Sequence, residues 1–225
     1  MELFLANFAS WQSFLTAWPL LWQGLVVTLG LVVVCLPLAA LSGLMVGVGY
    51  SFSGPLTRKF MVVGIDFIRA FPALVLLVVI YYSLPAFNIK LSAFWAVVVA
   101  LCLNNAGYFG EIFRAGIMSI DKGQFEAAHA LGFGPIRAMI YIILPQVMKR
   151  VIAPCASNAL ELVKETSLAS IVAMPELLRS ARVAQEQTYN PTPLTAVAII
   201  FFIMLWPFSK WVSRLERKAI IARKR

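Results

Sequence analysis

Residues 24–50 read GLVVTLGLVVVCLPLAALSGLMVGVGY and contain no charged side chain. The hydrocarbon core of a bilayer is about 30 Å thick, and about 20 apolar helical residues cross it. This stretch therefore predicts a transmembrane helix, with length to spare for tilt. The whole chain agrees, because 61% of its 225 residues are hydrophobic and only 13% are charged. A soluble domain carries about a quarter charged residues, so the sequence predicts an integral membrane protein.

Four more apolar segments follow the first one, each bounded by turn residues or charges. They cover about residues 60–84, 91–113, 151–174 and 194–212. The predicted fold is all-α, with five transmembrane helices in a membrane domain over residues 24–218 and a basic tail over 219–225. No internal duplication is evident, and five spans do not divide into equal halves. Both facts argue against a secondary transporter built from repeats.

The N-terminal residues carry aromatic side chains at helical spacing, among them Trp11, Trp18 and Trp22. Tryptophan favours the membrane–water interface, so residues 1–23 are predicted to form an interfacial helix. The alternative is an ordinary first span with aromatic anchors, against which the polar residues Gln12 and Gln23 argue. No basic residue precedes the first apolar segment, so no cleavable signal peptide is expected.

Basic residues set the predicted orientation, since they are enriched on the cytoplasmic side of membrane proteins. With the N-terminus outside and the C-terminus in the cytoplasm, the outer segments hold only Lys90, Arg179 and Arg182. Most of the 19 basic residues then lie in the cytoplasm, including those of the loop over 114–150. A basic tail beside anionic lipid accounts for the net charge of +9, so no nucleic-acid partner is expected.

Polar and ionisable residues recur inside three predicted spans. In the fourth span Asn158, Glu161 and Glu165 share one helix face. Lys164 is placed to pair with Glu161, which leaves one carboxylate without a local partner. Such groups usually face a cavity or a bundle interior, so they are predicted to line a pathway for a polar solute. The alternative is an ion-pair network without a substrate role. The candidate pathway residues are Arg69, Asn104, Asn105, Tyr108, Glu111, Asn158, Glu161, Lys164, Glu165 and Ser167.

The sequence contains no pattern typical of a catalytic or metal site. His129 is the only histidine, and the three cysteines lie in apolar runs without the spacing of metal ligands. A phosphate-binding loop of the Walker type is also missing from the sequence. We therefore expect no catalytic residues, no bound metal and no cofactor in this chain.

The cytoplasmic segment over residues 121–145 differs from its apolar surroundings. It begins with helical periodicity, and Gly132-Phe133-Gly134-Pro135 must then end that helix. Pro135 suits the first turn of a second helix. A short helix, a bend and a second helix form a shape suited to docking, although an ordinary connecting loop is the alternative.

Within this segment Glu126-Ala127-Ala128, Gly132, Ile142 and Leu144-Pro145 are spaced as in a known signature. The pattern resembles the EAA motif of ABC importer permeases. Three more segments resemble motifs of the polar amino acid (histidine, glutamine and arginine) subgroup. They are IRAFPAL at 68–74, YFGEIFRAG at 108–116 and LVKETSL at 162–168.

The resemblance implies a type I ABC importer permease in the bacterial cytoplasmic membrane, without ATPase activity of its own. ATP and Mg²⁺ would be bound by a separate ATPase dimer, a second permease would complete the pathway, and an extracytoplasmic binding protein would deliver a polar amino acid. The implied ATPase-coupling residues are Glu126, Ala127, Ala128, Gly132, Phe133 and Pro145.

Glu161 stands where the subgroup has an uncharged residue, which favours a cationic solute by analogy with members that handle basic amino acids. Two alternatives from other classes stay open. One is an ion-coupled secondary transporter that uses the carboxylates of the fourth span. The other is a membrane scaffold or enzyme whose polar residues only hold the bundle together.

Overall fold

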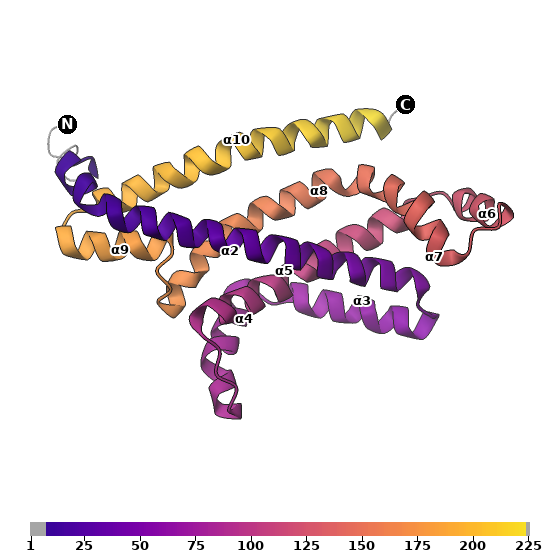
Figure 1. Cartoon of the computed structure of the whole chain (residues 1–225), viewed down its shortest axis with the longest axis horizontal. Helices are drawn as coiled ribbons and strands as arrows, with labels where there is room; N and C mark the ends of the chain where they lie inside the picture. The colour runs from indigo at the N-terminus through magenta and orange to yellow at the C-terminus, as the bar shows by residue number, and fades with distance from the viewer. Residues whose placement is uncertain (1–7, 224–225) are drawn as a thin grey trace. The chain divides into compact units, whose positions relative to one another are not determined.

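The computed structural model describes residues 8–223, and every regular element in that range is a helix (Figure 1). Part of the predicted N-terminal helix, residues 1–7, lies outside the described residues, as does the end of the basic tail. The elements in chain order are α2 (Trp11–Phe52), α3 (Pro55–Ala70), α4 (Ala73–Val78), η1 (Val79–Ser83), η2 (Leu84–Phe87), α5 (Ala93–Met118), α6 (Lys122–Ala130), α7 (Pro135–Ala138), η3 (Met139–Ile143), α8 (Leu144–Glu165), η4 (Thr166–Val172), α9 (Leu177–Thr188) and α10 (Thr192–Arg223).

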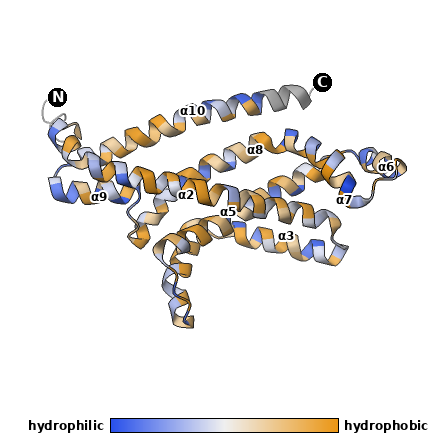
Figure 2. Ribbon diagram, in the orientation of Figure 1, coloured by the Kyte–Doolittle hydropathy of each residue, from blue (hydrophilic) through white to orange (hydrophobic). Residues whose placement is uncertain are grey.

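Within residues 8–223, four helices are long and apolar enough to cross a membrane: Trp11–Phe52, Ala93–Met118, Pro135–Val172 and Thr192–Arg217. Two shorter helices, Pro55–Ala70 and Ala73–Phe87, together form a fifth span if the 89° bend between them is counted within one span. Figure 2 shows the apolar residues along these helices and the hydrophilic residues gathered in α6, α7 and α9. The prediction of an all-α membrane protein is confirmed, with four spans, or five if the bent pair counts as one.

The bend in the second span lies at Pro72. Proline disfavours helical conformation in the residue before it, and Phe71 has an extended backbone with φ −85° and ψ 128°. The predicted span over about 60–84 corresponds to this bent pair of helices. Helix α3 ends at Ala70 and α4 begins at Ala73.

Helix α2 is continuous through the predicted boundary at residue 23. Its 42 residues correspond to about 63 Å, roughly twice the thickness of the hydrocarbon core. Trp11, Trp18 and Trp22 lie on its exposed side, and the rings of Trp18 and Trp22 are 6.2 Å apart. The predicted interfacial helix is therefore the first part of the first spanning helix, without a break between them. Its position at the membrane interface stays a prediction.

The polar segment over 175–193 forms helix α9, an element that the sequence did not predict. Its inner residues Leu177, Ala181 and Ala184 share a core with Ala17 and Leu21 of α2 and with part of α10. The buried Glu176 caps the helix, because its carboxylate accepts hydrogen bonds from the amides of Leu178 (2.8 Å) and Arg179 (2.7 Å).

The described chain divides into two compact units. Residues up to 36, 73–102 and 160–210 form the first unit, and residues 37–72, 103–159 and those from 211 onward form the second. In the second unit α2 packs so closely on α5 that a Cβ atom on Gly43 would clash with Phe109, and one on Gly47 would meet Phe113 at 2.6 Å. Small residues allow such close approach between membrane helices.

Candidate functional site

The coupling segment, residues 121–145, is built around helix α6. Asp121 begins the helix, since its side chain accepts a hydrogen bond from the amide of Gly123 at 2.7 Å. Gly132 ends it with φ +79°. The amide of Gly132 bonds to the carbonyl of His129 (2.9 Å), and that of Phe133 bonds to the carbonyl of Ala128 (3.0 Å). This pair of bonds is a Schellman motif, in which glycine is the usual residue because its left-handed backbone has no Cβ to strain.

A second helix starts directly after the bend, so the predicted helix–bend–helix arrangement is confirmed. Gly134 is extended with φ −65°, and Pro135 occupies the first turn of α7. The helical turns then continue through η3 into α8, so that Pro135–Val172 reads as one membrane span. Helix α7 is therefore continuous with the chain that is long and apolar enough to cross the bilayer.

The EAA residues differ in exposure. Glu126, Ala127, Gly132 and Pro145 are exposed, and Phe133 is half-buried. Ala128 is only 1% exposed, so it belongs to the inner side of α6 and offers no surface for docking.

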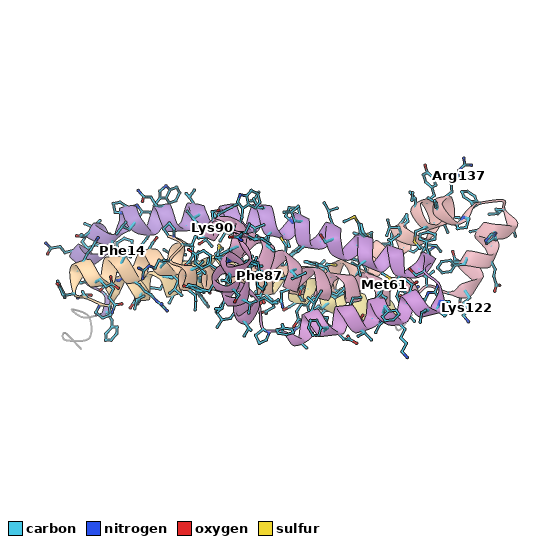
Figure 3. The ribbon with its side chains drawn as sticks, turned by 90° about the horizontal axis from the view of Figure 1, so that it is seen from below. Phe14, Met61, Phe87, Lys90, Lys122 and Arg137 are labelled. Atoms are coloured by element: carbon cyan, nitrogen blue, oxygen red, sulfur yellow. The ribbon has the colours of Figure 1, made fainter. Side chains whose placement is uncertain are left out.

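Two apolar side chains extend the exposed surface of the segment, and the sequence did not single them out. Leu131 is 74% exposed and Ile136 is 66% exposed. Figure 3 shows Arg137 pointing away from the ribbon on the same segment. Exposed apolar residues in a polar loop are typical of a surface that another protein covers.

Two side chains of α8, Gln146 and Arg150, form hydrogen bonds that join the start of this helix to α6 and to the end of α5; each set of bonds is called a brace below. The amide of Gln146 donates hydrogen bonds to Gln124 at the start of α6 (3.1 Å) and to the carbonyl of Ile142 (2.9 Å). The guanidinium of Arg150 donates to the carbonyl of Ser119 and to its hydroxyl (3.0 Å), at the end of α5. The sequence carries no sign of the second brace, because its partners are 31 residues apart.

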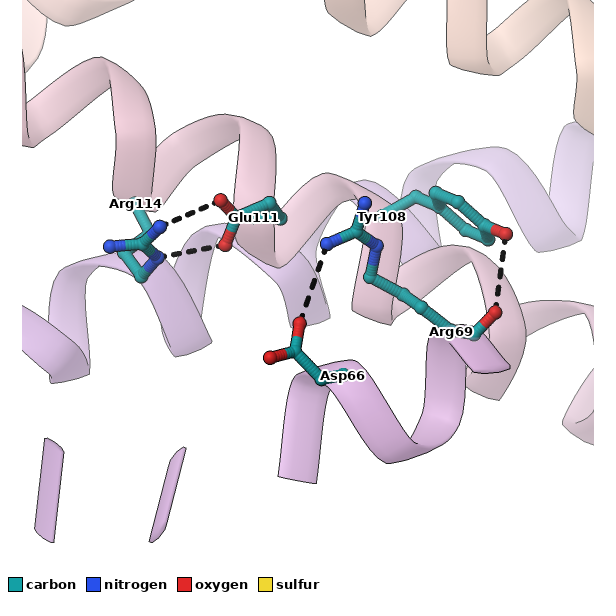
Figure 4. A network of polar contacts seen from close by, with 5 residues as sticks. All are labelled: Asp66, Arg69, Tyr108, Glu111 and Arg114. Carbon is teal, nitrogen blue, oxygen red and sulfur yellow. Dashed lines mark hydrogen bonds and ion pairs between the residues drawn. The ribbon is translucent and has the colours of Figure 1, made fainter. Parts of the chain in front are cut away.

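A polar network lies between α3 and α5 in the second unit (Figure 4). Arg69 pairs with Asp66, three residues before it, at 3.7 Å, and its guanidinium lies 5.2 Å from the centre of the Tyr108 ring. The Tyr108 hydroxyl donates to the carbonyl of Arg69 at 3.4 Å. Within the described part of the chain, the buried Nε of Arg69 has no hydrogen-bond partner.

Glu111 and Arg114 form a separate pair on α5. The guanidinium donates to both carboxylate oxygens at 2.7 Å, a bidentate arrangement that is stronger than a single contact. The Arg114 guanidinium also lies 5.3 Å from the centre of the Tyr50 ring. Glu111 is thus already paired along its own helix.

The two buried asparagines of α5 hold neighbouring helices. Asn104 donates to the carbonyl of Phe71 at 2.9 Å, which satisfies a backbone group left unpaired where Pro72 ends α3. Asn158 of α8 donates to Asn105 at 3.2 Å. These bonds give all three amides a structural role, and their predicted role in a pathway stays a prediction.

The charged residues of the fourth span lie at the end of α8 in the first unit. Lys164 pairs with Glu161 at 2.7 Å, yet their side chains are 46% and 60% exposed. Glu165 closes α8 and also makes an interaction in the structure, and the hydroxyl of Ser167 donates to the carbonyl of Lys164 at 2.8 Å. Exposure of charges to lipid is costly, so this face needs water, a solute or another protein beside it.

Comparison with known proteins decides the family. A family model described as "binding-protein-dependent transport system inner membrane component" matches residues 39–221. The chain belongs to this family. It is therefore a multi-pass permease subunit, a transport component and not a catalytic one.

The chain is also similar to permeases that are named for amino acids. The chain is 32% identical over 201 residues to the probable glutamine ABC transporter permease protein GlnP of Bacillus subtilis (strain 168), covering 87% of this chain and 92% of that one. It is 34% identical over 206 residues to the arginine transport system permease protein ArtQ of the same organism, covering 89% and 92%.

Solved structures agree with these relatives. A crystal structure of an amino acid ABC transporter with histidines matches with a TM-score of 0.81 and 35% identity, covering 92% of this chain and 97% of that chain. The MetNI methionine ABC transporter, at 20% identity and a TM-score of 0.73, shares the fold. The chain is thus a permease subunit of an amino acid ABC importer, which favours this prediction over the ion-coupled transporter and the scaffold.

Proposed function

We propose that two permease chains form the membrane pathway of an importer for polar, cationic amino acids, and that a separate pair of ATPase subunits drives it. The extracytoplasmic binding protein delivers the solute, and ATP with Mg²⁺ is bound by the ATPase subunits. The relatives named for glutamine and arginine support a polar amino acid. The membrane is the bacterial cytoplasmic membrane.

The observation that carries the proposal is the geometry of the coupling segment. A capped helix exposes Glu126 and Ala127, and Leu131 and Ile136 provide exposed apolar area on the same segment. Apolar side chains within a polar rim match the usual composition of a protein interface. Because α7 leads directly into α8, a partner that grips α6 and α7 can move the span.

The pathway part of the proposal rests on Glu161 and its neighbours. A carboxylate that is 60% exposed inside an apolar span supports a water-filled or solute-filled space. A carboxylate at this place favours a solute with a positive side chain.

Co-purification of the partner ATPase tests the docking. We expect Glu126→Lys and Gly132→Trp to lose the bound ATPase and ATP-driven uptake, because they reverse a charge and add bulk on the docking surface. Lys59→Glu is the matched control, since Lys59 is exposed at the start of α3, outside the segment. If both coupling variants retain the ATPase and uptake, the docking proposal is wrong.

A second measurement separates this proposal from ion-coupled transport. Uptake in cells should stop on ATP depletion and should continue when an uncoupler removes the ion gradient while ATP is maintained. The opposite pattern would favour a secondary transporter that uses the carboxylates of the fourth span.

A further inference from the structure

Helix α3 carries an apolar surface that the coupling segment and the polar networks do not use. Four of its apolar residues recur every three or four positions and so share one helix face, called the α3 stripe below: Leu56, Phe60, Val63 and Phe67. Their side chains are 59% to 69% exposed, whereas Ile65 on the opposite face is 5% exposed. The inner face of α3 therefore packs within the second unit, and the α3 stripe lies open in the described part of the chain.

Two cations lie at the start of the α3 stripe. Arg58 and Lys59 are both exposed, and the sequence has no acidic residue between Glu2 and Asp66. Among the residues that the structure describes, no carboxylate forms an ion pair with either cation. Their positive charges are therefore available to an anion from outside the chain.

The guanidinium of Arg58 is held in place by the last turn of α2. It donates to the carbonyls of Tyr50 (3.1 Å) and Ser51 (2.9 Å), and it lies 5.3 Å from the centre of the Tyr50 ring. Carbonyls at the end of a helix attract a cation but carry only a partial negative charge. A positive charge is thus fixed beside the start of the α3 stripe and is not neutralised there.

The length of the α3 stripe matches one leaflet of a bilayer. From Leu56 to Phe67 the helix rises by about 17 Å, because each helical residue adds about 1.5 Å. Half of the hydrocarbon core is about 15 Å thick. Basic residues favour the cytoplasmic side for the turn between α2 and α3. The two cations then lie at the level of the phosphates of the inner leaflet, and the α3 stripe lies along the acyl chains.

We infer that this surface binds an anionic phospholipid of the cytoplasmic leaflet, with its phosphate at Arg58 and Lys59 and an acyl chain along the α3 stripe. Basic side chains close to the membrane surface attract anionic headgroups. An apolar stripe alone accepts any lipid, and a pair of cations alone accepts any small anion. Their combination on one helix selects a molecule that has both parts. The inference concerns the lipid beside the permease and does not depend on which solute is transported.

Native mass spectrometry of the purified importer measures this selection. Phosphatidylglycerol and phosphatidylcholine are supplied in equal amounts, and loosely held lipid is then removed. The wild type should retain phosphatidylglycerol in preference. Lys59→Gln should lower the ratio of the two retained lipids about fivefold, the equivalent of about 1 kcal/mol for one cation near the surface. The double variant Arg58→Gln/Lys59→Gln should lower it further.

Lys122→Gln is the matched control, because it removes an exposed lysine at the start of α6, a helix without a comparable apolar stripe. It should leave the lipid ratio unchanged. Arg58 also bonds to the end of α2, so its replacement can lower stability. Lys59→Gln breaks no ion pair within the described residues and keeps the test valid if the double variant is unstable.

Two further measurements identify what occupies the surface. Phe60→benzoylphenylalanine places a photo-reactive group on the α3 stripe, and light should attach it to a phospholipid. Attachment to a second permease chain or to another protein overturns the inference. Excess inorganic phosphate should leave the lipid ratio unchanged, and loss of the preference would assign the cations to a free anion instead. An unchanged ratio in Lys59→Gln, or an equal fall in Lys122→Gln, also overturns the lipid site.

Discussion

Gly132 shows how one residue sets the shape of the coupling segment. Its φ of +79° allows the two Schellman bonds that end α6, and no heavy atom lies within 4 Å of the place where a Cβ would be. The requirement for glycine is therefore one of backbone conformation and not of space. Gly134, two residues later, is equally open but has an ordinary φ of −65°.

This pair of glycines yields the first prediction. Gly132→Ala should destabilise the segment by about 1 kcal/mol, because alanine strains a left-handed backbone. It should also weaken ATPase binding, which is measured by co-purification. Gly134→Ala adds the same methyl group without strain and should behave as the wild type. Equal behaviour of the two variants would contradict the role of φ.

Glu176 is a second residue of interest, because its buried environment changes the pKa of its carboxyl. Burial raises the pKa of its carboxyl, while the hydrogen bonds from Leu178 and Arg179 and the charge of Arg182 oppose that rise. The folded state therefore favours the protonated form more than the unfolded state does. The stability that this provides is present below the unfolded pKa, near 4.5, and is lost as the pH rises through the folded pKa.

Replacement of this carboxyl gives the second prediction. Glu176→Gln keeps an oxygen that can cap α9 but cannot ionise, so its melting temperature relative to the wild type should rise from pH 4.5 to pH 7.5. Glu176→Ala should lose the cap and about 1 kcal/mol at pH 4.5, and this deficit should shrink toward pH 7.5, because alanine cannot ionise either. Thermal unfolding in detergent measures both variants. A constant difference between wild type and Glu176→Gln across this range would contradict the effect of burial.

At the scale of elements, the start of α8 is tied to both sides of α6. The Gln146 brace reaches the first turn of α6, and the Arg150 brace reaches the end of α5. Motion of the coupling segment reaches α8 efficiently only if side-chain contacts hold α8 to the neighbouring helices. Gln146 and Arg150 provide such contacts, since both belong to α8, the helix that continues into the membrane.

The third prediction concerns the Arg150 brace. Arg150→Met should keep the ATPase bound but lower the amount of solute transported per ATP hydrolysed severalfold, because α5 and α8 no longer move together. Arg150→Lys should restore part of the coupling. Lys149→Met, at the exposed neighbouring position, is the control. The brace has no such role if the ratio of transport to hydrolysis is unchanged in Arg150→Met.

At the scale of the whole molecule, the predicted pathway residues fall into two compact units. Glu161, Lys164, Glu165 and Ser167 belong to the first unit, and the other six belong to the second. Within the second unit most of them are engaged by neighbours, whereas Glu161 and Lys164 form an exposed pair. The charge on α8 is therefore the best candidate for contact with a solute.

The fourth prediction follows from this exposed charge. Glu161→Gln should raise the KM for arginine uptake in proteoliposomes roughly fivefold, the equivalent of about 1 kcal/mol for a partly solvated charge pair. The KM for glutamine should change little. Glu216→Gln removes the same charge near the end of α10 and serves as the control. Equal changes for both solutes would contradict a cationic preference.

The sequence by itself determined the membrane class, the positions of the apolar segments and the helix–bend–helix segment. These features are local: apolar length, charge distribution and the backbone limits of glycine and proline act within a few residues. The resemblance of the spaced EAA residues to a known signature also led to the correct family.

Only the tertiary structure decided which of the singled-out side chains are available. Ala128 is buried and the asparagines of α5 are bonded to other helices. Exposure, burial or contacts that the sequence does not display gave candidate roles to four further residues: Leu131, Ile136, Arg150 and Glu176. The physical reason is that burial and hydrogen bonding depend on residues brought together from distant parts of the chain, as Arg150 is with Ser119.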